Sequence, residues 1–258
     1  MISRLPRTLH NTVWGSDRTS PWFETPRGTK LGEIWFEASD QVPLLVKLLF
    51  TSEKLSVQVH PQDAYARTHH NCSGKTEMWH ILRADPGARI ALGLNRSITP
   101  EQLREAAVSG AIVDLLNWIS ARPGDTFFVP AGTIHAISEG LVLCEVQQVS
   151  NVTYRLFDYQ RGRELHLDHS VAVAHCGAHE SAQVGLPLEC GYFKTGRLEA
   201  KGSVEIGPIE RGAIYVALQG EGTIAGEAFR AGEAFEMAAG ARFRIESPDA
   251  AFLFTEAR

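Results

Sequence analysis

The chain has 258 residues, of which 44% are hydrophobic and 21% are charged. This composition is typical of a globular protein with one large or two small domains, and it excludes disordered, coiled-coil and collagen-like classes. Lys and Arg number 25 against 30 Asp and Glu, which gives a formal charge of −5. Because proteins that bind a nucleic-acid backbone carry a basic excess, we expect no nucleic-acid partner.

The most apolar stretch, residues 43–50, is interrupted by Lys47 and is much shorter than the roughly 20 residues that span a bilayer. The first residues of the chain contain no apolar segment of about 7–15 residues before a small-residue cleavage site. We therefore expect no signal peptide, no membrane association and a cytoplasmic location. The four cysteines form no C-x-x-C pair, so free thiols are expected.

The predicted elements begin with β-strands. Runs rich in β-branched and aromatic residues recur between turn-forming residues, and the first three are IWFEA, LSVQVH and EMWHIL. A helix is expected next at residues 99–110, where Thr99 and Gln102 form a capping box, Pro100 lies in the first turn and Gly110 ends the helix. A second, short helix is expected at residues 112–118.

Further strand-like runs follow, namely DTFFVP, GLVLCEV, TYRLFDY and, nearer the C-terminus, AIYVAL. Between the last two runs, residues 165–184 fit a helix and a loop equally well. Many short strands separated by turn residues are typical of a β-sandwich or β-barrel. The sequence therefore predicts an all-β fold with a few helices.

One stretch of the chain is repeated. Residues 122–137, RPGDTFFVPAGTIHAI, align without gaps to residues 230–245, RAGEAFEMAAGARFRI, with six of sixteen positions identical. Matching glycines indicate matching turns, and matching apolar residues indicate the same strand faces, so we expect two related β-units rather than chance similarity. Where the first copy has His135 the second has Phe243. A metal site is therefore expected only in the first unit.

Polar residues alternate with valines in residues 55–60, so that Ser56, Gln58 and His60 share one face of a strand. For an isolated strand the ordinary interpretation is a solvated outer face. His135 favours a different one, because it closes the pattern G-x5-P-x-G-x2-H. This spacing resembles the second motif of the cupin family, in which the histidine binds a metal inside a small β-barrel.

Family cupins carry two histidines and a glutamate close together, whereas here residues 61–76 separate His60 from Glu77. This arrangement resembles type I mannose-6-phosphate isomerases. The strings that carry the resemblance stand in the family's order and cover most of residues 12–170: GEIW, PLLVK, Q-x-H-P, GKTE, PAGTIH, E-x-Q-Q, TYR and RELH. The resemblance implies a duplicated cupin fold, that is, a jelly-roll β-barrel with a degenerate second barrel.

The resemblance also implies one Zn²⁺ per chain, held by Gln58, His60, Glu77 and His135. Two neutral imidazoles, a carboxylate and an amide oxygen suit Zn²⁺ and leave a net positive charge with room for a water or substrate oxygen. A cation beside O1 and O2 of an open-chain sugar stabilises the charge that develops as a proton moves between C2 and C1 through an enediol. The implied activity interconverts mannose 6-phosphate and fructose 6-phosphate.

Other site residues follow from the same resemblance. It implies a cationic pair, Lys75 and Arg155, beside the substrate, and it makes Glu145 the best carboxylate candidate for proton transfer, an effect typically worth about 10²–10⁴-fold in rate. Ser56 would help to hold the phosphate together with a basic group. The identity of the general base stays open, and so does the oligomeric state. The expected partner is a small-molecule sugar phosphate.

Each role has an ordinary structural alternative. Lys75 would then be a solvated charge in a Gly-Lys turn, Arg155 would pair with Asp158 or Glu145 on a sheet surface, and Glu145 would be only that partner. The tryptophans are expected in the core or in a pocket wall: Trp14, Trp35 and Trp79.

Four histidines raise the alternative of a second metal site, and two of them would share a helical face at i, i+4 spacing: His166, His169, His175 and His179. Solvent-facing histidines beside Asp168 and Glu180 are the favoured interpretation.

The resemblance divides the chain into two domains. Residues 1–185 would form the metal-binding catalytic cupin domain, with a short helical insert near 99–118, and residues 186–258 a smaller cupin-like β domain that serves as structural packing. Longer relatives carry an extra segment where this chain has only the connection 36–42. A pocket wall is therefore expected to be missing, which would relax specificity or weaken affinity for the phosphate.

Two other functions stay open beside the leading one, a zinc-dependent isomerase. A non-catalytic cupin that binds or senses a sugar or sugar phosphate would need the metal ligands but not Lys75 and Arg155, and both are present. An iron-dependent cupin oxygenase would use two histidines and a carboxylate with open positions. The additional Gln58 and the GKTE and TYR strings argue against it.

Overall fold

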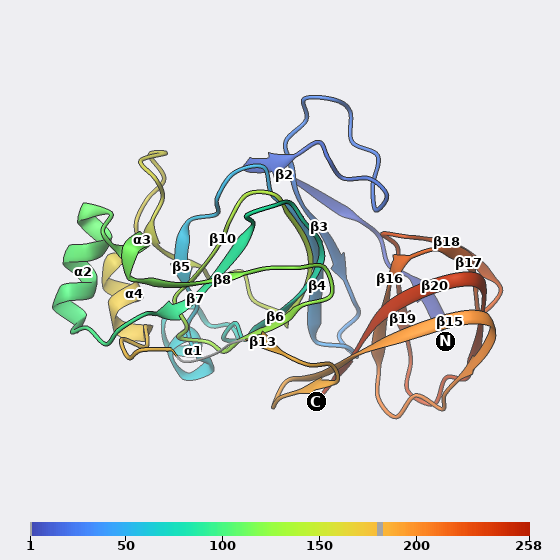
Figure 1. Ribbon diagram of the computed structural model, residues 1–258. Helices are drawn as coiled ribbons and strands as arrows, with labels where there is room; N and C mark the ends of the chain where they lie inside the picture. Colours follow the sequence, from blue (N-terminus) through green and yellow to red (C-terminus); the bar gives the residue numbers. More distant parts are fainter. Residues whose placement is uncertain (1, 180–182) are drawn as a thin grey trace. The chain divides into compact units, whose positions relative to one another are not determined.

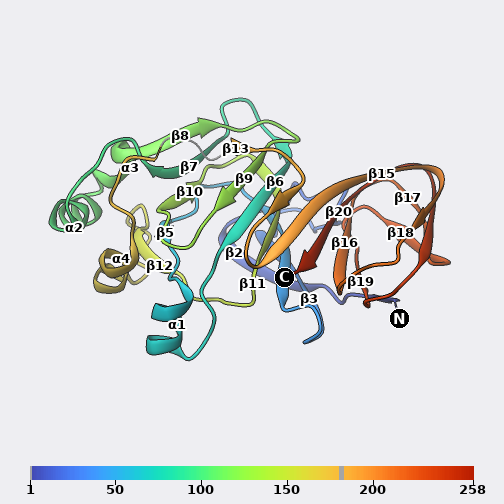
Figure 2. The same cartoon turned by 90° about the horizontal axis from the view of Figure 1, so that it is seen from below.

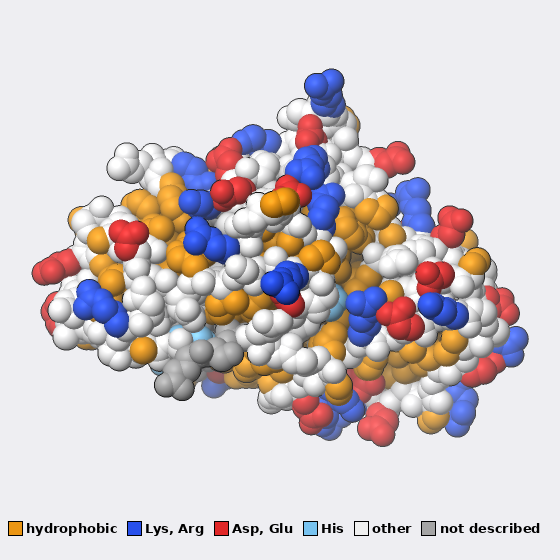
Figure 3. Space-filling view, in the orientation of Figure 1, with side chains coloured by type: hydrophobic (Ala, Val, Ile, Leu, Met, Phe, Trp, Pro, Cys, Tyr) orange, Lys and Arg blue, Asp and Glu red, His pale blue; other side chains and the backbone are white. Residues whose placement is uncertain are grey.

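The computed structural model describes residues 2–179 and 183–258, and its elements are labelled in Figure 1. The described chain is mostly β, with four helices: α1 (Asp63–His70), α2 (Pro100–Ser109), α3 (Ile112–Leu115) and α4 (Leu167–Val173). None of these helices is long and apolar enough to cross a membrane. Lys and Arg are interspersed with Asp and Glu on the face in Figure 3, in keeping with their similar numbers in the sequence.

The chain separates into two compact units. The central unit comprises residues 13–15 and 49–184, and the C-terminal unit comprises residues 1–12, 16–48 and 185–258. Residues 16–48 thus cluster with the C-terminal segment, whereas the sequence predicts them in a domain that ends at residue 185. The functional division of the chain into a catalytic domain and a packing domain stays a prediction.

The central unit contains a five-stranded antiparallel sheet. Its order is β12 (Tyr154–Phe157), β5 (Val57–Val59), β10 (His135–Ile137), β7 (Arg89–Leu94) and β8 (Leu116–Ser120). A second set of antiparallel strands runs in the order β13 (Gln183–Val184), β9 (Thr126–Val129), β6 (Glu77–Ala84) and β11 (Leu141–Gln148). The functional side chains described below come from these two sets of strands and from the residues next to them.

The alternation in residues 55–60 has the predicted structural effect. Val57 and Val59 are fully buried in an apolar cluster with Leu103 of α2 and Leu156 of β12. Because successive strand residues point to opposite faces, this packing directs Gln58 and its polar neighbours away from the helices. Figures 1 and 2 show α2, α3 and α4 together at one end of the central unit, and Figure 2 shows α1 near β12.

The helix at residues 99–110 is confirmed. Thr99 caps α2, with the capping box to Gln102 complete in both directions, and Gly110 ends it in the left-handed conformation. The predicted helix at residues 112–118 is partly wrong, because α3 ends at Leu115 and residues 116–118 belong to β8. Pairing of β8 with β7 satisfies the backbone there and overrides the local helical pattern.

In the stretch left open between helix and loop, Leu167–Val173 form α4, and the chain leaves the helix at Ala174, which is extended. His175 and His179 therefore do not share a helical face, so the geometry of the alternative second metal site is absent here. Their backbone amides instead donate to Gly132 O (2.8 Å) and Leu94 O (2.9 Å). Helix α1, in the segment between His60 and Glu77, was not expected.

The C-terminal unit is built on a sheet in the order β1 (Ile2–Arg4), β19 (Ala234–Met237), β16 (Ala213–Gln219), β20 (Phe243–Ala257), β15 (Phe193–Ile206) and β14 (Leu188–Glu189). β17 (Glu221–Ile224) pairs with β18 (Glu227–Arg230) and with β20. The unit also contains β3 (Leu31–Glu37), most of β2 (Thr8–Ser16) and the first five residues of β4 (Leu44–Phe50).

The repeated stretches form the same local structure. β9 and β19 start and end at aligned residues, and β10 and β20 start at the aligned pair His135 and Phe243. The glycines between them adopt positive φ in both copies, with 91° at Gly132 and 76° at Gly240. Phe243 is buried and packs edge-on against Tyr215, so the position that carries a histidine in the first copy is an apolar core position in the second.

Candidate metal centre and active site

Strand pairing places three of the predicted site residues side by side. In the five-stranded sheet, Gln58 is directly opposite His135 of β10 on one side and Arg155 of β12 on the other. Directly paired residues of antiparallel strands point to the same face of the sheet. Gln58, His135 and Arg155 therefore form a row across three strands, and His60 lies two residues beyond Gln58.

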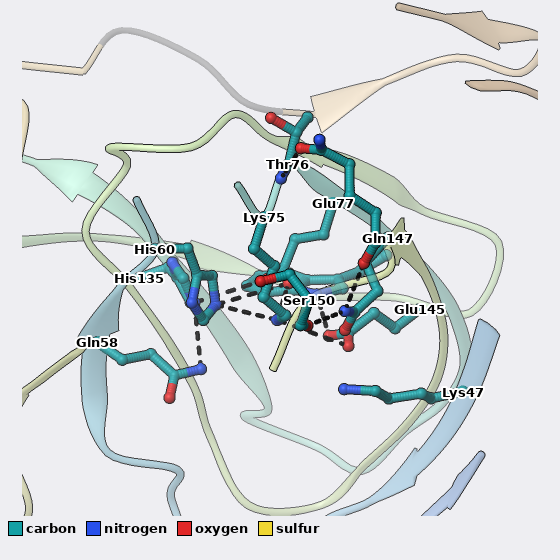
Figure 4. Close-up of polar contacts among 12 residues, drawn as sticks. Lys47, Gln58, His60, Lys75, Thr76, Glu77, His135, Glu145, Gln147 and Ser150 are labelled. Atoms are coloured by element: carbon teal, nitrogen blue, oxygen red, sulfur yellow. Dashed lines mark hydrogen bonds and ion pairs between the residues drawn. The ribbon is translucent and has the colours of Figure 1, made fainter. Parts of the chain in front are cut away.

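The second set of strands contributes the carboxylates. Glu77 opens β6 opposite Gln147, and Trp79 of β6 is opposite Glu145 of β11. Glu77 and Trp79 are two residues apart, so their side chains leave the same face of the strand. Figure 4 shows Glu77 next to His60 and His135, with Glu145 on its other side.

Three metal-binding side chains meet in the interior. The ligand atoms of His60, Glu77 and His135 all lie within 4.8 Å of one another, and all three residues are buried. Glu77 Oε2 is 3.6 Å from His60 Nε2, and Glu77 Oε1 is 3.6 Å from His135 Nε2. Two imidazole nitrogens and a carboxylate around one point form a donor set that suits a divalent transition-metal ion.

Backbone carbonyls orient both imidazoles. His60 Nδ1 lies 3.0 Å from Val152 O, and His135 Nδ1 lies 2.9 Å from Thr133 O. A carbonyl only accepts, so each Nδ1 carries the proton and each Nε2 is left unprotonated, 3.6 Å from a Glu77 oxygen. Burial lowers the pKa of His135 to about 4, against the favourable hydrogen bond to Thr133. The ring is therefore neutral near pH 7, the form that binds metals.

Gln58 completes the ring of donors. Its Nε2 lies 3.2 Å from His135 Nε2. Rotation of the amide by 180° about its terminal bond exchanges Nε2 and Oε1, which brings a ligand oxygen to the same place. Ser56 is buried on this face, with Oγ 3.4 Å from Gln58 Oε1. Gln58, His60, Glu77 and His135 are thus brought together as predicted, and their role as ligands stays a prediction.

Lys75 is part of the same group. It is only 4% exposed, and its Nζ donates to Glu77 Oε2 and to His60 Nε2, the latter at 3.1 Å. Glu145 Oε1 is 3.8 Å away. A buried ammonium requires such partners, because desolvation of an isolated charge costs several kcal/mol. The alternative of a solvated charge in a Gly-Lys turn is wrong.

Glu145 lies between Lys75 and Trp79. The Trp79 indole Nε1 donates to Glu145 Oε2 at 3.0 Å, which fixes the orientation of the carboxylate. Trp79 is fully buried and packs edge-on against the His135 ring, with centroids 5.4 Å apart. The prediction that this tryptophan belongs to the core is confirmed. Glu145 is therefore a buried, oriented carboxylate beside the candidate metal ligands.

Arg155 is half-buried in the row with Gln58. Its Nη1 donates to Glu164 O at 2.7 Å, and its backbone N–H donates to His166 Nδ1 at 3.1 Å. Burial and the neighbouring Arg163 lower its pKa. The Asp158 carboxylate accepts from Nε and Nη2 of Arg163 and lies 3.0 Å from Arg161 Nη2.

Comparison with known proteins identifies the family. Over 228 residues the chain is 37% identical to mannose-6-phosphate isomerase ManA of Bacillus subtilis, an alignment that covers 78% of this chain and 72% of ManA. The chain belongs to the mannose-6-phosphate isomerase family. It is also 33% identical over 222 residues to the mannose-6-phosphate isomerase of Streptococcus mutans serotype c, with 77% of this chain and 70% of that protein covered. No family model matches the chain.

The fold agrees with this assignment. The crystal structure of the mannose 6-phosphate isomerase from Bacillus subtilis matches with a TM-score of 0.86 and 26% sequence identity, over 98% of each chain. The chain therefore has the fold of the mannose-6-phosphate isomerase family, and the resemblance found in its motifs is confirmed.

The histidines at residues 166–179 do not form a second cluster of this kind. In the described part of the chain, His60, Glu77 and His135 make up the one group of three or more metal-binding side chains. His169 Nδ1 lies 2.9 Å from Tyr65 OH instead, and Glu180 lies outside the described residues.

Several supporting groups were not predicted from the sequence. The carbonyls of Val152 and Thr133 orient the two imidazoles, but a backbone carbonyl has no signature in the residue type. Asp63 and Gln148 bind the loop that carries Lys75. Gln148 belongs to the E-x-Q-Q string of the resemblance, which was a signal without an assigned role.

Proposed function

We propose that this chain is a zinc-dependent isomerase that interconverts mannose 6-phosphate and fructose 6-phosphate by proton transfer through an enediol. The observation that carries the proposal is the buried group His60, Glu77 and His135, in which both imidazole Nε2 atoms are unprotonated and lie 3.6 Å from a carboxylate oxygen. It occurs in a chain that is 37% identical to a mannose-6-phosphate isomerase.

The donor set supports Zn²⁺ held by Gln58, His60, Glu77 and His135. The second ring nitrogen of each histidine is bound to a carbonyl, the arrangement that fixes the tautomer of metal-binding histidines. When bound, the ion polarises the open-chain carbonyl and stabilises negative charge on O1 and O2. All further steps are assigned to this chain's own residues.

Charge stabilisation and proton transfer are assigned to the charged residues around the candidate ligands. Lys75 Nζ and the Arg155 guanidinium supply positive charge beside the substrate oxygens, where an enediol intermediate is most anionic. Glu145 transfers the proton between C2 and C1, and the indole N–H of Trp79 holds its carboxylate in place. Lys75 lies within reach of both carboxylates of the site, 3.8 Å from Glu145 Oε1 and in contact with Glu77 Oε2.

Ser56 and Arg155 are assigned to the phosphate. Ser56 lies next to Gln58 on the polar face of residues 55–60, and Arg155 is paired with Gln58 across the strands. A guanidinium and a hydroxyl are suitable donors for a phosphate. The short connection before β4 would leave a pocket wall missing, and we propose that specificity is relaxed or phosphate affinity weakened as a result.

The fold proposal is a pair of cupin barrels, of which the second is degenerate. It is supported by the coincident strand boundaries of the two copies and by Phe243, which fills the His135 position with an apolar side chain. The second unit then serves as packing.

The experiment is incubation of the zinc-loaded protein with mannose 6-phosphate in D₂O. We expect fructose 6-phosphate with deuterium at C1, because the carboxylate that carries the proton exchanges with solvent. Binding of the sugar phosphate without product would support a non-catalytic cupin instead. Oxygen uptake with an iron-loaded protein would support an oxygenase.

A further inference from the structure

The first and last residues of the segment between His60 and Glu77 lie against each other. Residues 61–76 separate His60 from Glu77 in the sequence, yet the Lys75 N–H donates to Pro61 O at 3.1 Å. The Gly74 N–H donates to Asp63 Oδ1 at 2.8 Å. A Cβ at Gly74 would lie 2.6 Å from Asp63 N and 2.7 Å from Pro61 O. The two ends of the segment therefore touch, and only glycine fits at the contact.

Gln148, the last residue of β11, binds both ends of this segment by hydrogen bonds. Its Nε2 donates to the same Asp63 Oδ1 at 3.0 Å, and its Oε1 accepts from the Thr76 N–H at 2.9 Å. Its backbone N–H donates to Thr76 O at 3.2 Å. Both backbone groups of Thr76, the residue between Lys75 and Glu77, are thus bound by one buried glutamine.

The same residues connect to the loop before His135. The hydroxyl of Thr76 accepts from the Ala131 N–H at 3.2 Å, and the Gly132 N–H donates to His60 O at 2.8 Å. The network therefore reaches every segment that carries a member of the buried His-Glu-His group.

We infer that Asp63 and Gln148 are positioning residues, which hold the backbone of residues 74–77 so that Lys75 and Glu77 meet the imidazoles. Asp63 binds the Gly74 N–H and Gln148 binds the Thr76 N–H, so each acts on Lys75 and Glu77 through a neighbouring backbone group. Loss of either would leave buried N–H groups of this loop unsatisfied and let it move. Because displacements of about 1 Å at a reacting centre cost about 10²-fold in rate, the effect should reach the chemistry.

A purely structural role makes a different prediction. Asp63 lies in the first turn of α1, where a carboxylate also stabilises the helix dipole. Asp168 lies in the first turn of α4 and pairs with Arg104 at 2.5 Å, but it is exposed and has no bond to residues 74–77. Asp168→Ala is therefore the matched control for loss of a first-turn carboxylate.

The inference rests on the proposed function for its kinetic and zinc-affinity measurements, whereas amide exchange in the metal-free protein is independent of that function. The variants are Asp63→Ala, Asp63→Asn and Gln148→Ala, with Asp168→Ala as control. Three readouts are compared: zinc affinity by chelator competition, kcat and KM for mannose 6-phosphate, and hydrogen exchange of the Gly74 and Thr76 amides in metal-free protein. Melting curves show that each variant is folded.

We expect Asp63→Ala and Gln148→Ala to lose about 10–100-fold in zinc affinity and kcat, the range seen when groups that orient metal ligands are removed. Exchange of the two amides should accelerate at least about 10-fold. Asp63→Asn keeps an oxygen acceptor at the Oδ1 position, so it should stay within a few-fold of wild type. Asp168→Ala should match wild type.

Wild-type zinc affinity, kcat and amide exchange in Asp63→Ala would overturn the inference. Equal losses in Asp63→Ala, Asp63→Asn and Asp168→Ala would also overturn it, because they would indicate a helix-dipole effect. If wild type failed to turn over mannose 6-phosphate, the proposed function would fail, while zinc affinity and amide exchange would still decide the role of Asp63.

Discussion

Replacing Lys75 with Met removes a buried ammonium while keeping the length of the side chain. In the structure, Nζ donates to Glu77 Oε2 and His60 Nε2, and the Glu77 side chain has no exposed surface. Removal of one partner of a buried ion pair costs about 3–5 kcal/mol, because the other charge keeps its desolvation penalty. We therefore expect the free energy of unfolding of the metal-free protein to fall by about that amount.

The control is a surface pair. Arg104 and Asp168 lie 2.5 Å apart, but their side chains are 44% and 90% exposed, and such pairs contribute about 0–1 kcal/mol. Arg104→Met should therefore be nearly silent. The double variant Lys75→Met, Glu77→Gln removes both buried charges and should be less destabilised than Lys75→Met alone.

Urea denaturation of the four metal-free proteins at pH 7 measures these differences, since the midpoint shift at constant slope reports the change in stability. A loss in Lys75→Met no larger than that in Arg104→Met would refute the argument, because it would mean that the ammonium does not neutralise Glu77 in the folded protein.

Three further outcomes are expected. Arg155→Lys should lower turnover of mannose 6-phosphate by about 10–100-fold with bound zinc and melting unchanged, since a lost charge-assisted hydrogen bond costs about 1.5–3 kcal/mol; wild-type turnover would remove the catalytic assignment. Phe243→Ala should lower the free energy of unfolding by about 3–5 kcal/mol without changing the zinc content of the folded protein; loss of zinc at unchanged stability would contradict the division of labour between the two units. Burial lowers the pKa of His135 from 6.5 to about 4, so as the pH falls the unfolded metal-free chain takes up this proton first, and the free energy of unfolding should drop by roughly 3 kcal/mol between pH 6.5 and 4. His135→Gln should flatten that part of the pH profile, whereas parallel profiles would rule out His135 as the cause.

Features set by local chemistry were predictable. The capping box of Thr99 and Gln102 is complete within four residues, so α2 followed from the sequence. The gapless repeat at residues 122–137 and 230–245 predicted matching turns, and the strands do begin at matching residues. The polar face of residues 55–60 followed from the two-residue period of a strand.

Features set by distant partners were not predictable. Residues 116–118 have a helical pattern, but β7 pairs with them and makes a strand. Gln62, the N-cap of α1, makes no side-chain cap hydrogen bond, so this helix lacks the capping signature that identified α2. The pairing of Gln58 with His135 depends on strand register, which one sequence does not specify, so the convergence of the site rested on the family resemblance. Lys75 can be buried because Glu77 and His60 accept hydrogen bonds from it, and these two residues are separated in the sequence by residues 61–76.

The central claim is that the buried group of His60, Glu77 and His135 holds the ion on which isomerisation depends. The most direct test measures bound zinc and turnover of mannose 6-phosphate on the same preparations of wild type and His135→Ala. Wild type should contain one zinc per chain and form fructose 6-phosphate. His135→Ala should remain folded but lose both the zinc and the activity, because it lacks one of four protein ligands. A full equivalent of zinc together with full activity in His135→Ala would contradict the assignment of the metal centre.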